Sequence, residues 1–126
     1  MQHWFDYVKV SYDLVIETES RLGLVLEHEV EAYVVHLFAK NINRVDIGHG
    51  AVALKVLEHM HNPELLARAA DECLLIHSYP LRRNRWPTDT YYIDMGTVAY
   101  ALAGNTLMES NFVPASKVLG AVFKQN

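Results

Sequence analysis

Residues 29–40 read EVEAYVVHLFAK, and their spacing predicts the clearest helix in this 126-residue sequence. Apolar side chains recur there at intervals of three and four, which places them on one face of a helix; they are Val30, Tyr33, Val34, Leu37 and Phe38. Glu29, His36 and Lys40 fall on the other face. We therefore expect a helix from about Leu26 to Asn41 that buries its apolar side.

The segment before this helix, roughly Trp4 to Ser20, has two interpretations. Apolar and polar residues alternate from Val8 to Ile16, as in a strand. Polar residues also step by three and four along one helical stripe, which runs Asp6, Lys9, Asp13, Glu17 and Ser20. We favour the helix, with Phe5, Val8, Tyr12, Val15 and Ile16 on its apolar side and Gly23 just beyond its end.

Four more helices are predicted after Gly50. The first covers about Ala51 to His61, and the second starts at the Asn62-Pro63-Glu64 boundary and ends near Ser78. The others cover about 88–103 and Ser110 to Lys124, separated by Gly104 and Asn105. The helix over 88–103 is apolar around most of its circumference, so we expect it to be central. Its small residues Gly96, Ala99 and Ala103 would let another helix approach closely.

The fold class that follows is all-α: a single domain over residues 1–126, built as a bundle of five to six helices with short loops. The composition is 51% hydrophobic and 21% charged, which excludes intrinsic disorder. The formal net charge of −4 argues against a nucleic-acid partner recognised through an overall positive field. A local basic patch stays compatible with that charge.

Location is predicted from what the sequence lacks. The first residues contain no basic region followed by a long apolar run, so we expect no signal peptide. No apolar run approaches the ~20 residues that cross a bilayer, so we expect no membrane partner. The single cysteine, Cys73, rules out an intrachain disulfide and fits a cytoplasmic protein. No cofactor-binding motif is present, and we predict no cofactor.

Metal binding rests on weak candidates. Glu58 and His61 form one Glu-x-x-His half-site, whereas a di-iron bundle needs two half-sites and further carboxylates. The candidate ligands are Glu58, His59, His61 and His77, with His49 as a possible third ligand of zinc. We favour a solvated face near a helix end for this cluster.

Nucleophilic catalysis would need an activated thiol. Cys73 and His77 lie four residues apart on the same helix face, so a Cys–His pair is geometrically feasible. A cysteine in the middle of an apolar helix is more often a small core residue, which is the interpretation we favour. We therefore assign no catalytic residue.

The candidate binding residues lie in a basic loop and in the helix after it. The loop combines three planar guanidinium groups with an indole ring, from Arg82, Arg83, Arg85 and Trp86. This combination suits a phosphate, a carboxylate or an acidic partner. The alternative is that the arginines pair with Asp71, Glu72 or Asp89. The second group, Tyr91, Tyr92, Asp94 and Tyr100, would line a pocket or a dimer seam, or would pack in the core with satisfied hydroxyls.

Residues 91–100 read YYIDMGTVAY and resemble a Tyr-Tyr-x-x-Met-Gly-x-x-Ala-Tyr helix. That helix is found in a family of small α-helical bacterial proteins to which no activity is assigned. The resemblance covers about residues 26–104 and includes the acidic-apolar helix before Pro80. It departs at His77-Ser78-Tyr79, where a more aromatic turn is expected. The resemblance implies a small helical cytoplasmic protein and no particular reaction.

Three functions are compatible with these observations. The one we favour is a non-enzymatic protein-interaction or adaptor module that associates with a protein partner or with itself as a homodimer, because no complete catalytic set is present. The second is a helical protein that binds a small ligand or a metal. The third is an enzyme acting on an anionic small molecule, with the arginines as a clamp and Asp94 or a tyrosine as the acid–base group.

Overall fold

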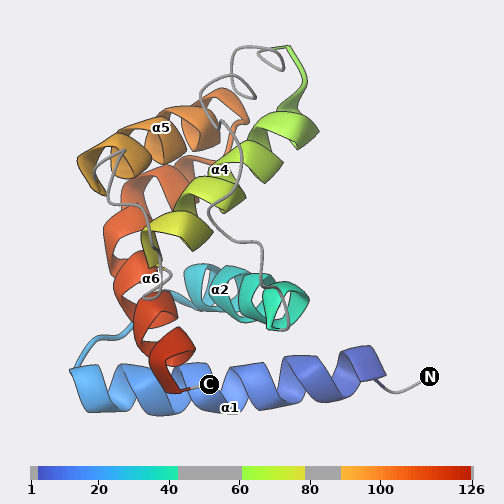
Figure 1. Cartoon of the computed structure of the whole chain (residues 1–126), viewed down its shortest axis with the longest axis vertical. Coiled ribbons are helices and arrows are strands. Elements are labelled where there is room, and N and C mark those ends of the chain that lie inside the picture. The colour runs from blue at the N-terminus through green and yellow to red at the C-terminus, as the bar shows by residue number, and fades with distance from the viewer. Residues whose placement is uncertain (1–2, 43–60, 79–88, 126) are drawn as a thin grey trace.

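The computed structural model describes residues 3–42, 61–78 and 89–125, and these residues form five helices and no strands (Figure 1). The helices are α1 (His3–Leu22), α2 (His28–Asn41), α4 (Pro63–Ser78), α5 (Asp89–Leu102) and α6 (Thr106–Gln125). The all-α prediction is confirmed for these residues. The helix predicted over 51–61 lies outside them, so the total number of helices stays a prediction.

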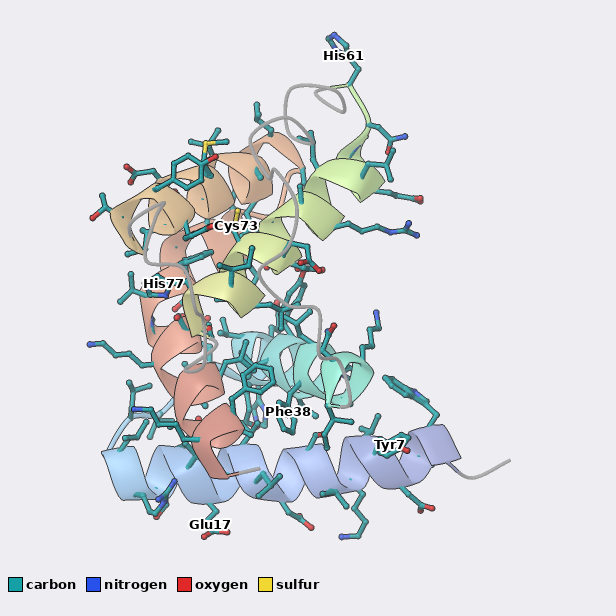
Figure 2. All side chains as sticks on the ribbon, viewed as in Figure 1. Tyr7, Glu17, Phe38, His61, Cys73 and His77 are labelled. Atoms are coloured by element: carbon teal, nitrogen blue, oxygen red, sulfur yellow. The ribbon has the colours of Figure 1, made fainter. Side chains whose placement is uncertain are left out.

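The first segment is a helix, as favoured over the strand, and its polar stripe is exposed to solvent. Figure 2 shows Glu17 of this stripe pointing away from the other helices. The helix ends at Gly23, whose φ of 65° is the left-handed conformation that glycine adopts without a Cβ clash. Gly23 N donates to Ser20 O and Leu24 N donates to Glu19 O, which satisfies two carbonyls at the helix end.

The apolar side predicted for α1 is only partly buried. Val15 is fully buried, but Phe5, Tyr12 and Ile16 are exposed. The buried stripe is instead narrow and includes three polar residues, Ser11, Thr18 and Glu19. Much of the apolar surface of α1 therefore lies on the flanks of the helix rather than in the core.

The helices form two pairs joined by α6. Helix α1 packs against α2, and α4 packs most extensively against α5 (Figure 1). Helix α6 runs from α5 to α1 and contacts all four of these helices, whereas α5 packs mainly against α4 and α6. The central position predicted for residues 88–103 is therefore not confirmed by the described helices.

The junctions around α4 and α6 follow from local chemistry. Asn62 caps α4 as predicted, because its Oδ1 accepts a hydrogen bond from Leu65 N at 3.2 Å. Asn105 caps α6 in the same way through Met108 N at 3.1 Å, so this helix begins four residues earlier than predicted. The backbone of α6 is non-helical at Asn111, three residues before Pro114, which has no N–H to continue the helical ladder.

One core unites all five helices. The face predicted for α2 is confirmed, with Val30, Val34 and Phe38 fully buried. Gly96 of α5 lies against α6 so closely that a Cβ would overlap the ring of Phe112. The predicted small-residue position therefore allows the close approach of two helices.

Candidate functional site

Helix α1 carries most of the exposed large hydrophobic side chains of the described residues. Seven of their eleven exposed large hydrophobic side chains belong to this one helix: Trp4, Phe5, Tyr7, Val10, Tyr12, Ile16 and Leu22. Phe5 is the most open of them, with 77% of its surface exposed. Large exposed apolar patches on small proteins are a common feature of contact surfaces.

Part of this surface forms one wall of a groove between α1 and α2. The groove has a volume of about 590 Å³, within the range of small-molecule sites. From α1 it is lined by Trp4, Phe5, Val8, Lys9 and Tyr12, and from α2 by His28, Glu31, Ala32, Val35 and His36. Trp4 and His36 lie across it from each other, with ring centroids 6.3 Å apart.

The groove contains one buried acidic side chain, Glu31, which is 9% exposed. Its carboxyl group is hydrogen-bonded to that of Glu19, a buried residue near the end of α1. Burial, this hydrogen bond and the negative charge of Glu19 together raise the pKa of Glu31 from 4.5 to about 7, and nearby His28 opposes the rise. Two carboxylates are both acceptors, so their hydrogen bond requires one proton between them.

The Glu19 carboxyl group also accepts a hydrogen bond from the backbone. Its Oε2 accepts a hydrogen bond from Leu26 N at 2.8 Å, in the connection between α1 and α2. Its Oε1 is buried and has no hydrogen-bond partner among the described residues.

A second depression, of about 460 Å³, lies on the other side of α2. It is lined by Tyr33, Lys40 and Asp71, among others, and shares His36 and Ala32 with the groove. Asp71 Oδ1 accepts hydrogen bonds from the hydroxyls of Tyr33 and Tyr100, the latter at 2.7 Å. Burial raises the pKa of Asp71, although the two hydroxyls lower it.

The predicted tyrosine group is divided by the structure. Tyr100 is fully buried and bonded to Asp71, and its pKa is raised by burial and by that carboxylate. Tyr92 is buried near the start of α5, where its ring meets that of Tyr91 edge to face at 5.2 Å. Asp94 is exposed. Tyr100 therefore contacts Asp71, whereas Tyr91 and Tyr92 contact each other.

The basic loop and part of the predicted metal cluster lie outside the described residues. This holds for Arg82, Arg83, Arg85 and Trp86, and for His49, Glu58 and His59. Of the remaining metal candidates, His61 is exposed just before the start of α4, far from α1 (Figure 2). Among the side chains that the structure describes, no three histidine, cysteine or acidic residues are arranged to hold a metal.

Cys73 and His77 have different surroundings. Cys73 is fully buried, and burial raises the pKa of its thiol to about 12, which disfavours the thiolate needed for catalysis. His77 Nδ1 is hydrogen-bonded to Ser116 Oγ of α6, and its ring lies against Phe112. Ser116 Oγ is also 3.0 Å from Ser78 Oγ, so this cluster ties α4 to α6.

Comparison with protein-family models, with curated proteins and with solved structures finds no match to this chain. No helix in the described ranges combines the length and the apolar character that crossing a bilayer requires.

The groove is not predicted by the sequence analysis, although the sequence does place the acidic Glu31 at a core position of α2. Glu31, Val34, Val35 and Phe38 follow the same three-and-four spacing, and all four are buried. An acidic residue at a core position of a helix indicates a protonated or paired carboxyl group. Its partner, Glu19, is not indicated by any local pattern, because the contact depends on how α1 and α2 pack.

Proposed function

We propose that this protein is a helical protein-interaction module and that α1 provides its contact surface. The observation that supports the proposal is the concentration of seven exposed large hydrophobic side chains on this helix. Burying such side chains releases about 25 cal/mol per Å² of apolar area, which makes them the natural source of binding energy.

The apolar surface extends beyond the groove, which favours a macromolecular partner. Tyr7, Val10 and half-buried Leu14 are spaced three and four residues apart along α1, and none of them lines the groove. We call these three residues the α1 seam. A seam with this spacing is typical of helix–helix pairing.

The partner that we propose first is a second copy of the chain. A two-fold axis brings the same patch of two copies together, so one apolar seam on one helix is enough to build a symmetric interface. A cytoplasmic location is part of this proposal and rests on the sequence.

Light scattering coupled to size-exclusion chromatography tests the dimer. We expect twice the 14.4 kDa chain mass for the wild type and the single-chain mass for Val10→Asp, which introduces a charge into the seam. Val25→Asp is the matched control, because Val25 is 90% exposed but lies between α1 and α2. A wild-type protein that stays monomeric up to about 1 mM, where weak dimers form, overturns the homodimer.

Binding of a small ligand in the groove is the second candidate function. Its support is the groove between two helices, with a volume of about 590 Å³ and a mainly apolar lining that contains a few polar groups. The seam and the groove lie on different flanks of α1, so the two functions are compatible.

A further inference from the structure

We propose that the groove between α1 and α2 binds an amphipathic cation, in which an ammonium group contacts the Glu31 carboxylate and an apolar chain lies against Trp4, Phe5 and Val8. The proposal rests on the second candidate function, small-ligand binding, and names the chemical class of the ligand.

The first argument concerns charge. Glu31 is the only acidic side chain that lines the groove within the described residues, and it is buried against Glu19. A pair of buried carboxyl groups needs a positive partner, which is either a proton or a cation. An ammonium group brings three N–H donors, so it can bond to Glu31 after the shared proton has left.

We next consider whether the other charged groups around the groove occupy the position proposed for the ammonium group beside Glu31. Lys9 is on the groove wall, but its Nζ lies 3.4 Å from Asp13 Oδ2, and both side chains are mostly exposed. His28 stabilises the ionised form of Glu31 through its charge. His36 also lines the groove, and its Nδ1 lies 2.8 Å from Ala32 O. Glu19 on α1 and His28 on α2 are the two side chains whose charge acts on Glu31, and an ammonium ligand would act in the same direction as His28.

The second argument concerns the walls. Three aromatic side chains of α1, Trp4, Phe5 and Tyr12, line the groove and are 46%, 77% and 48% exposed. Aromatic faces attract ammonium groups as well as apolar surface, whereas they gain nothing from an anion. Val8, Ala32 and Val35 supply aliphatic contacts for the rest of the ligand.

The test compares three probes of similar size and different charge: hexylamine, 1-hexanol and hexanoate. Two-dimensional NMR titrations of the full chain measure each affinity and map the contact to α1 and α2. We expect hexylamine to bind about tenfold more tightly than 1-hexanol, as one charge-assisted hydrogen bond provides, and hexanoate to bind more weakly than either.

Substitution of Glu31 distinguishes recognition of the cation from binding of apolar ligands in the groove. Glu31→Gln should remove the preference for hexylamine and leave 1-hexanol binding unchanged, while its amide can still donate to Glu19. Glu29→Gln is the matched control, since Glu29 is exposed, lies on the same helix and does not line the groove. Retention of native NMR dispersion shows that each variant folds.

Proton competition gives an independent readout. Because the ammonium replaces the shared proton, hexylamine should bind more tightly at pH 8 than at pH 6, and 1-hexanol should not. The difference should shrink in Glu31→Gln, which keeps the groove histidines His28 and His36 and so separates their charge from the Glu31 proton. Equal affinities for hexylamine and 1-hexanol overturn the cation claim and leave ligand binding standing. No binding of any probe to α1 and α2 overturns both the inference and the ligand-binding function.

Discussion

Asp71 accepts hydrogen bonds from two tyrosine hydroxyls that come from different helices. Tyr33 belongs to α2 and Tyr100 to α5, while Asp71 lies on α4. The rings of the two tyrosines also meet edge to face, with centroids 6.0 Å apart. A single carboxylate therefore links the α1–α2 pair to the α4–α5 pair.

Tyr100→Phe tests this link. The substitution removes a buried donor to a carboxylate, and we expect it to lower the free energy of unfolding by about 1.5–3 kcal/mol. It should also raise the pKa of Asp71 further, because that hydroxyl favours the charged form. Urea unfolding and carboxyl NMR titration measure the two effects, with Tyr91→Phe on the same helix as the control. Equal losses for both variants would contradict the assignment.

Gly96→Ala tests the contact between α5 and its neighbours. A Cβ at this position would overlap the Phe112 ring and lie 3.0 Å from the Cβ of Cys73. We expect the added methyl group to destabilise the protein by about 1–3 kcal/mol, despite the better helix propensity of alanine. Thermal unfolding measures the change, and Ala101→Ser at an exposed position of α5 should have little effect. A stabilised Gly96→Ala variant would show that Phe112 moves freely.

Single residues illustrate what sequence can predict. Local spacing correctly predicted that Val30 and Phe38 are buried, because helix periodicity alone decides which face they share. The acceptor of the Tyr100 hydroxyl was not predictable, since Asp71 lies 29 residues away. In the structure Asp71 is bonded to two tyrosine hydroxyls, and the loop arginines that the sequence offers as its alternative partners lie outside the described residues.

At the scale of elements, we expect the stability of the packing between α1 and α2 to depend on pH through Glu31 of α2. The unfolded chain loses the Glu31 proton near pH 4.5, whereas the folded chain keeps it until about pH 7. Between these values the folded state holds more protons, so stability must fall as the pH rises. Asp71, whose pKa is also raised, contributes with the same sign.

We therefore expect urea unfolding to give a larger free energy at pH 5 than at pH 8. Glu31→Gln should reduce that difference, because it removes the titrating group while keeping a donor toward Glu19. Glu29→Gln should leave the difference unchanged, since Glu29 is exposed. A pH dependence that is the same in wild type and Glu31→Gln would show that Glu31 does not carry the proton.

Element boundaries were predictable where a cap is local. Asn62 begins α4 by accepting a hydrogen bond from Leu65 N on its side chain. Gly23 ends α1, where backbone hydrogen bonds join residues no more than five apart. Helix α6 begins before the predicted Ser110 because Asn105 serves two helices: its N–H donates to Tyr100 O of α5, while its side chain caps α6. The exposed flank of α1 was not predictable, because the width of a buried stripe depends on how closely α2 and α6 pack.

At the scale of the whole molecule, the charge should change sign within a narrow pH range. The formal net charge is −4 with neutral histidines, and protonating all seven histidines would bring it to +3. His28, His36 and His61 are exposed, so solvent can reach them for protonation. Carboxyl groups with raised pKa values add to the shift, since Glu31 and Asp71 lose negative charge earlier than ordinary acids.

Electrophoretic mobility measures this change directly. We expect migration toward the anode at pH 7 and toward the cathode at pH 5, with the crossing near the sequence pI of about 5.9. The α1 seam is apolar and should not share this dependence, so the mass in light scattering should be similar at both pH values. Mobility that keeps its sign would mean that several histidines stay neutral, and dimer loss at pH 5 would mean that charge rather than the seam controls association.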